Sequence, residues 1–168
     1  MKIPFRNIKF FTQIIILSII FNLSLGGCSK YSNEVEANLT KLKKTKACSG
    51  CDLSGIELIS FDLKNADISG ADLTGANLSK SDLTGANLTD TNLNDANLLG
   101  VNLTGATLTN TNLTGVKLSY ANISEVEMSN VMLVRAKMNN AKVVNSNISY
   151  TDMTGANLYN ANLSDTRV

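Results

Sequence analysis

A five-residue period runs through most of this chain and limits what it can fold into. The stretch ADLTGANLSKSDLTGANL, residues 71–88, has leucine at every fifth position, preceded by Asp or Asn and, one place earlier, by Ala or Ser. An α-helix repeats every 3.6 residues and a flat strand every two, so neither produces a period of five. The period therefore predicts a repeated structural unit in which each five-residue segment has the same role.

The period continues without a break from Cys51 to Val168. Its central place is filled by Leu, Ile, Met or Val in all twenty-four segments. Two places earlier the residue is mostly Ala, Ser, Thr or Val, the place between is mainly Asp or Asn, and the fifth place is largely Gly, Asn or Asp. We therefore expect an aliphatic and a small residue to point inward, polar residues to point outward, and a corner that needs positive φ at the fifth place.

This pattern, A-(D/N)-L-x-x, resembles the pentapeptide-repeat family over residues 51–168. KACSGCDLSG, residues 46–55, also resembles the start of such arrays in bacterial members of the family. The resemblance implies an all-β fold, a right-handed quadrilateral β-helix with four segments per coil. At that coil length residues 51–168 make about six coils, and a spacing of about 4.8 Å gives a solenoid roughly 28 Å long.

The first 28 residues have the features of an export signal. Three basic residues precede the apolar run FFTQIIILSIIFNLSL, which leads into LGGC at residues 25–28. This is the order of a secretory signal peptide, and the run is shorter than the about 20 residues that a membrane span needs. LGGC resembles the lipobox of bacterial lipoproteins, which implies that residues 1–27 are removed and that Cys28 carries lipid. Ser29 resembles the sorting residue of lipoproteins at the Gram-negative outer membrane. The alternative is an uncleaved membrane helix.

Residues 28–47 are expected to form a tether and a short capping helix. Asn33 is the expected N-cap, paired with Glu36 in a capping-box pattern. Val35, Leu39 and Leu42 form a narrow apolar stripe, which needs a partner such as the first coil of the solenoid. The four lysines near the end of this segment could instead contact anionic headgroups, and the two roles are compatible.

Cys48 and Cys51 form a CxxC pair at the start of the solenoid, which we expect to cover residues 48–168. The chain has no His and no second pair of cysteines, so a tetrahedral zinc site within one chain is not expected. A thioredoxin-like site would need a βαβ context, which the repeat does not provide. Two structural readings stay open: a local disulfide, or two reduced thiols that pack as small hydrophobic groups.

Charge and composition exclude several functions. The absence of His removes the commonest general base and metal ligand. Acidic residues recur where the repeat requires Asp or Asn, so we expect no catalytic residue, no metal and no cofactor. DNA mimicry of the gyrase-interacting type needs a strongly acidic surface, whereas residues 51–168 hold seven basic and twelve acidic groups, a net −5. It remains the alternative, followed by a CxxC redox protein, and we expect no nucleic-acid partner.

One stretch departs from the polar outward pattern. Met132 and Val134 occupy outward places, as does Val144 in the same expected coil, and exposed apolar residues often mark an interface. Relaxed drift of the repeat is an equally good explanation. The repeat register also continues to Val168, so an open edge predicts a homodimer through the C-terminal coils.

These features together predict a non-catalytic structural or protein-interaction module of the bacterial cell envelope. It would be exported, held in the membrane through lipidated Cys28, face the periplasm from the outer membrane, and contact an unknown envelope protein.

Overall fold

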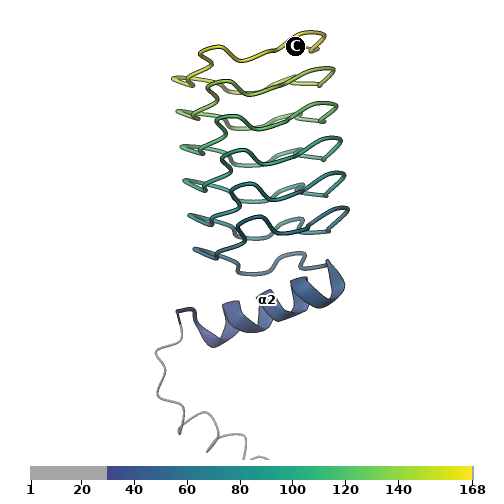
Figure 1. Cartoon of the computed structure of the whole chain (residues 1–168), viewed down its shortest axis with the longest axis vertical. Coiled ribbons are helices and arrows are strands. Elements are labelled where there is room, and N and C mark those ends of the chain that lie inside the picture. The colour runs from purple at the N-terminus through teal and green to yellow at the C-terminus, as the bar shows by residue number, and fades with distance from the viewer. Residues whose placement is uncertain (1–29, 168) are drawn as a thin grey trace, which may run out of the picture. The chain divides into compact units, whose positions relative to one another are not determined.

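The computed structural model describes residues 30–167, which form one helix and a solenoid (Figure 1). The helix, α2 (Asn33–Thr45), lies across the first coil. The solenoid has no strand longer than an isolated β-bridge among the described residues. Each five-residue segment bends after its central residue, so only its second residue is left to form a bridge. The predicted signal peptide and Cys28 lie outside the described residues.

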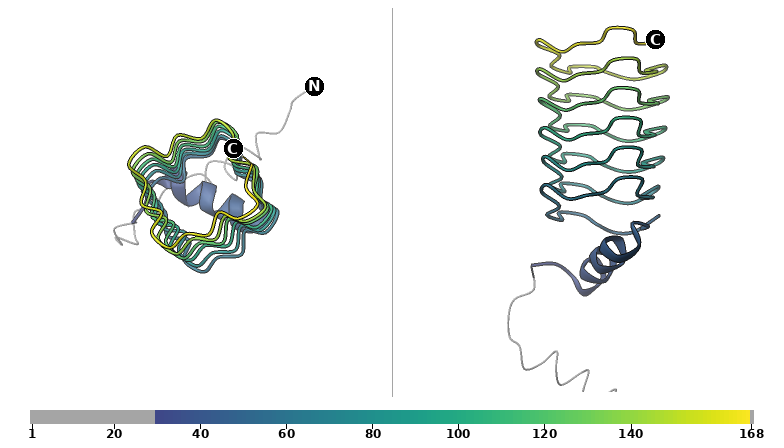
Figure 2. Two further views of the ribbon diagram at one scale, coloured as in Figure 1. Left: turned by 90° about the horizontal axis from the view of Figure 1, so that it is seen from above. Right: turned by 45° about the vertical axis from the view of Figure 1, so that its right-hand side comes forward.

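The coils stack in parallel with a register of twenty residues. Every bridge joins residue i to residue i + 20, from Ala47↔Asp67 to Asn147↔Arg167. Seen from above, the coils superpose on a four-sided outline (Figure 2). We number the four sides by their outward bridge residues. Face 1 holds Asp52, Asp72, Asn92, Asn112, Met132 and Asp152; face 2 holds Glu57, Asn77, Asn97, Lys117, Lys137 and Asn157; face 3 holds Asp62, Asp82, Asn102, Asn122, Lys142 and Asn162; face 4 holds Ala47, Asp67, Asn87, Thr107, Glu127, Asn147 and Arg167.

Backbone hydrogen bonds both turn the chain at each corner and join the coils. At Leu73, the backbone N–H donates to Asn92 O in the next coil at 2.7 Å, and Asn92 N–H donates back to Ala71 O at 3.0 Å. Ala76 N–H closes the corner onto Leu73 O at 3.0 Å. The fifth residue of each segment has positive φ, as the sequence predicts. At Gly85, with φ of 66°, a Cβ would meet only the end of the Asn65 side chain, which can move, so the positive φ rather than lack of space favours glycine there.

The core is a column of aliphatic and small side chains, as predicted. The central residues from Leu53 to Val143 and most residues two places before them are buried. Each buried leucine contributes about 1.5–3 kcal/mol. Buried inward hydroxyls also fit, because they donate to carbonyls in the preceding coil: Thr91 Oγ1 donates to Ile68 O at 2.9 Å and Thr111 Oγ1 to Leu88 O at 2.8 Å.

The predicted helix is present, with one correction at its start. The N-cap is Ser32, whose Oγ accepts from Val35 N–H at 3.2 Å, and not Asn33, which is the first helical residue. Val35 and Leu42 are buried and Leu39 is partly buried against the core, so the predicted apolar stripe contacts the first coil. The stripe, rather than the cap, sets which side of the helix faces the solenoid.

Polar contacts complete the cap of the first coil. Asn38 Nδ2 donates to Asp52 O at 3.0 Å, and Glu57 N–H donates to the Tyr31 hydroxyl at 3.0 Å. Lys46 pairs with Asp62 at 2.7 Å. The contacts of Asn38 and Tyr31 pair backbone groups that a preceding coil would otherwise have paired.

Candidate functional site

The outward Asp and Asn residues form ladders along the faces of the solenoid. Asn97 Nδ2 donates to Asn77 Oδ1 at 3.1 Å, and Asn77 Nδ2 donates to Glu57 Oε2 at 3.1 Å. Ladders on other faces run in the same direction, from Asn87 to Asp67 and from Asn102 to Asp82. Because a carboxylate only accepts hydrogen bonds, it fits the first rung, whereas asparagine can accept and donate on the rungs that follow. This explains why acids concentrate in the early coils.

These carboxylates also accept hydrogen bonds from the residue two places later in the chain. The hydroxyl and the backbone N–H of Ser69 both donate to Asp67 Oδ1, at 2.7 and 3.2 Å, and lower the pKa of that carboxyl. The Thr84 hydroxyl, with a smaller contribution from its N–H, lowers the pKa of Asp82 in the same way. A general acid needs a raised pKa, so these residues are suited to structure rather than to proton transfer at neutral pH.

The structure joins Cys48 and Cys51 by a disulfide, one of the two arrangements that the sequence left open. Cys48 is fully buried and Cys51 nearly so, and both sulfur atoms contact helix α2, at Asn38 O and Lys41 Nζ. Their redox state in the cell stays a prediction. No group of three or more Cys, Asp or Glu side chains in residues 30–167 is placed to hold a metal ion.

The outward apolar residues of the late coils do not form one patch. Met132 is exposed on face 1, and Val134 beside it is half-buried. Val144 is also half-buried, but it follows the bridge residue Lys142 on face 3, the opposite side of the solenoid. The interface predicted from these three residues is therefore divided between two faces, and only Met132 and Val134 can contact the same partner surface.

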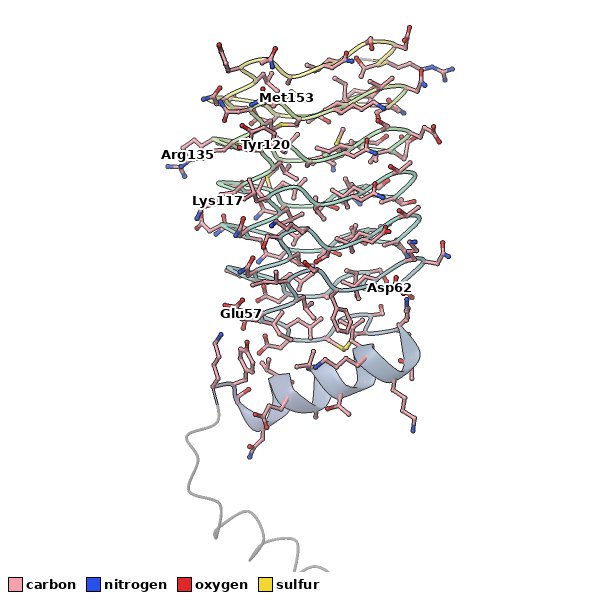
Figure 3. All side chains as sticks on the ribbon, in the orientation of Figure 1. Glu57, Asp62, Lys117, Tyr120, Arg135 and Met153 are labelled. Carbon is pink, nitrogen blue, oxygen red and sulfur yellow. A yellow bond between two sulfur atoms is a disulfide. The ribbon has the colours of Figure 1, made fainter. Side chains whose placement is uncertain are left out.

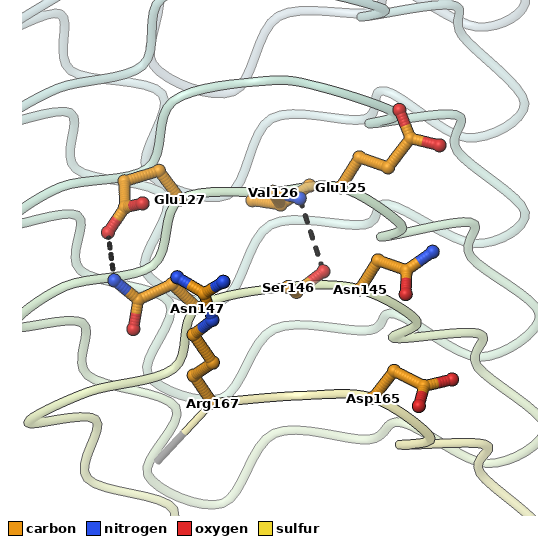
Figure 4. A pocket seen from close by; sticks show the side chains of 8 residues that line it. All are labelled: Glu125, Val126, Glu127, Asn145, Ser146, Asn147, Asp165 and Arg167. Carbon is orange, nitrogen blue, oxygen red and sulfur yellow. Dashed lines mark hydrogen bonds between the residues drawn. The ribbon is translucent and has the colours of Figure 1, made fainter.

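A groove that the sequence analysis did not identify lies on face 4 and its neighbouring corner (Figure 4). Its volume is about 320 Å³, and it is lined by Glu125, Val126, Glu127, Asn145, Ser146, Asn147, Asp165 and Arg167. The corner bond from Val126 N–H to Ile123 O is not formed here. Instead the buried Ser146 hydroxyl donates to Ile123 O at 2.8 Å and accepts from Val126 N–H at 3.1 Å. Side-chain hydroxyl bonding thus replaces a backbone turn at this corner.

The groove offers few groups that could bind or react with a ligand. Glu127 Oε1 already accepts from Asn147 Nδ2 and from the Ser129 hydroxyl, each at 2.6 Å. Its lining includes no Cys, and ligand sites of this size are usually more apolar. The sequence holds one sign of this groove: Glu127 and Arg167 stand on face 4 at places where other coils mostly have a short polar residue.

Within the described part of the chain, no helix has the length and apolar character that a bilayer crossing requires. This finding concerns residues 30–167 and does not bear on the apolar run before Cys28.

Comparison with known proteins identifies the repeat. The family model described as pentapeptide repeats matches residues 48–85, 81–119, 111–149 and 136–168, with eight copies. The comparison with curated proteins gave no match.

Solved structures of the same kind are similar to this chain. The pentapeptide repeat protein alr5209 of Nostoc PCC 7120 is 23% identical with a TM-score of 0.50, and the match covers 73% of this chain and 93% of that one. Rfr23 of the cyanobacterium Cyanothece 51142 is 24% identical with a TM-score of 0.48, covering 79% and 97%. QnrB1, a plasmid-mediated fluoroquinolone resistance protein, is 20% identical with a TM-score of 0.45, covering 71% and 72%. The likeness to alr5209 shows a shared solenoid fold.

Proposed function

The chain belongs to the pentapeptide-repeat family, and from that premise we propose that it is a non-catalytic, lipid-anchored protein of the bacterial cell envelope. The observation that carries this proposal is the order of basic residues, apolar run and LGGC at residues 25–28. In this proposal signal peptidase cleaves before Cys28, and acyl chains on Cys28 hold the solenoid at the periplasmic face of the outer membrane.

The polar surface supports a structural or protein-binding role. Carboxylates that begin ladders or pair with lysine, such as Asp67 and Asp82, are held in place by their hydrogen bonds. The groove on face 4 offers carboxylates, amides and one guanidinium, without a cysteine or histidine that would act as nucleophile or base. A partner protein would bind the outer surface, and face 1 around Met132 and Val134 is the candidate contact.

The charge distribution does not favour DNA mimicry. Residues 101–168 hold five basic and four acidic groups. In the early coils Asp62 pairs with Lys46 and Asp82 with Lys64. A surface of this kind lacks the continuous negative charge that would imitate a nucleic-acid backbone.

The anchor is tested by metabolic labelling with palmitate in the full chain. Wild type and the Cys48→Ser/Cys51→Ser variant should both incorporate label, because the second retains Cys28 as its single cysteine. Cys28→Ala should lose the label and leave the membrane fraction. Label that persists in Cys28→Ala would show that the anchor assignment is wrong.

Self-association through the C-terminal coils is tested separately by sedimentation velocity of a chain that begins at Ser29. We expect a dimer, and a monomer across the accessible concentration range would remove a second copy of the chain from the proposed partners.

A further inference from the structure

A ridge of exposed apolar side chains follows one corner of the solenoid. Six large hydrophobic residues are exposed in the described part of the chain, and four of them, Ile59, Leu99, Tyr120 and Tyr159, lie at the corner between faces 2 and 3. We call these four residues the ridge. They come from four different coils, so the ridge extends along the solenoid from its first coil to its last. Scattered apolar residues need no explanation, but a row along one edge indicates a surface that contacts something apolar.

The fold itself does not require one of the two tyrosines of the ridge, Tyr120. Tyr120 occupies a fifth place, with φ of 61°, where its corner has Gly100 one coil before and Asn140 one coil after. A left-handed conformation is unfavourable for a bulky side chain and easily adopted by glycine or asparagine. Tyr120 is nevertheless 67% exposed, so burial within the protein does not compensate for this strain. Tyr150 has the same strain at the opposite corner, so strain shows only that the fold does not require Tyr120, and the alignment of the four ridge residues carries the inference.

Lysines flank the ridge on both sides. Lys117 and Lys137 lie on face 2, Lys142 lies on face 3, and Lys80 is at the corner itself; all four are exposed. None of them lies within ion-pair distance of a carboxylate among residues 30–167. The acids of face 3, Asp62 and Asp82, are paired with other lysines, and the acid of face 2, Glu57, is at its N-terminal end. An apolar edge between lysines is the arrangement of elements that lie in a membrane interface.

The N-terminal segment leads to this same side of the solenoid. The Tyr31 hydroxyl accepts from the backbone N–H of Glu57, the first bridge residue of face 2, at 3.0 Å. Glu57, Lys117 and Tyr120 are labelled in Figure 3. Cys28 precedes Tyr31 by three residues, and three residues span at most about 11 Å. A lipid on Cys28 would therefore hold the N-terminal end of face 2 close to the membrane.

We propose that the anchored solenoid lies on its side on an anionic membrane surface, with the ridge in the interface and the flanking lysines on the headgroups. The ridge supplies two tyrosines, whose apolar rings and polar hydroxyls suit that depth, and lysines are attracted to anionic lipid. This inference rests on the proposed lipid anchor. The inference adds the orientation of the solenoid on the membrane. In this orientation faces 1 and 4 do not face the bilayer, so a partner protein can reach them.

The chain has no tryptophan, so a single substitution gives a unique fluorescent probe. We compare Tyr120→Trp and Tyr159→Trp with Tyr150→Trp in the lipidated full chain, reconstituted into vesicles of phosphatidylethanolamine and phosphatidylglycerol with brominated acyl chains. Tyr150 is a matched control for Tyr120, because it also has positive φ at a fifth place, is exposed, and lies at the opposite corner. We expect a blue shift and loss of emission for the probes at 120 and 159, and neither change at 150.

Each other outcome overturns the proposal in a distinguishable way. Protein that floats with the vesicles but shows equal emission from all three probes keeps the anchor and refutes the orientation. Protein that carries no acyl chain and does not float refutes both the anchor and the orientation. Emission at position 120 that depends on protein concentration and not on brominated lipid would assign the ridge to a second copy of the chain. As a further arm, Lys117→Gln with Lys137→Gln should reduce quenching at 120 in anionic vesicles; unchanged quenching would refute the role of the lysines.

Discussion

The stacked core predicts that one substitution has different effects at two places in the same column. Leu83 and Leu163 both occupy the central place on face 3, four coils apart, but Leu83 is fully buried and Leu163 only partly. Replacing leucine with alanine removes about 2.4 kcal/mol of transfer free energy when the side chain is fully buried. A closed cavity adds about 1–2 kcal/mol. We therefore expect Leu83→Ala to lower the free energy of unfolding by about 3.5–4.5 kcal/mol, and Leu163→Ala by about 1 kcal/mol, since its site is partly open to solvent.

The assay is urea unfolding followed by far-UV circular dichroism, on a chain that begins at Ser29. The two variants should share the wild-type denaturant slope, so that the change in midpoint reports stability alone. Equal losses for the two variants would refute the stacked core, because coils cover Leu83 on both sides and leave Leu163 partly open. A loss below about 1 kcal/mol at Leu83 would do the same.

Three further predictions concern the cap, the ladders and the corner. Reduction of the Cys48–Cys51 disulfide should lower the free energy of unfolding by about 2 kcal/mol, a modest loss because the closed loop is short. Thiol alkylation without reductant, followed by mass spectrometry, reports whether the disulfide is formed. Full alkylation of both cysteines would show that the pair is reduced. Hydrogen bonds lower the pKa of Asp82 in the folded chain, so the ionised carboxyl contributes its full stabilisation above the ordinary pKa of 3.8 and loses it as pH falls through the folded pKa. Asp82→Asn should therefore weaken the loss of stability in acid. An unchanged dependence of stability on pH would contradict this. Tyr120→Asn should stabilise the soluble chain by about 0.5–1 kcal/mol by relieving its left-handed strain, and a lower melting temperature would argue against that strain.

The sequence predicts the interior better than the surface, for a physical reason. Each inward side chain must pack against the coils before and after it, so the period predicts an aliphatic residue at Leu73 and a mostly smaller one at the place of Ala76. The same holds for the stripe of Val35 and Leu42 on the helix. The N-cap was misassigned because Ser32 and Asn33 are both good caps and adjacent, and sequence alone does not fix which one leaves the helical conformation.

The outer surface depends on geometry that the five-residue period does not encode. Met132 and Val144 are close in sequence, but two corners lie between them, so they point in opposite directions. The ridge has the reverse property: Ile59 and Tyr159 are distant in sequence and align because one hundred residues make whole coils. The groove on face 4 depends on Ser146, an inward serine of the kind found in other coils, whose hydroxyl here replaces a corner bond.

Mass spectrometry of the N-terminal peptide isolated from envelope fractions decides whether this solenoid is a lipoprotein. We expect a mature chain that begins at Cys28 and carries a diacylglyceryl group on its sulfur. A chain that retains residues 1–27, or that begins elsewhere with an unmodified Cys28, would contradict it.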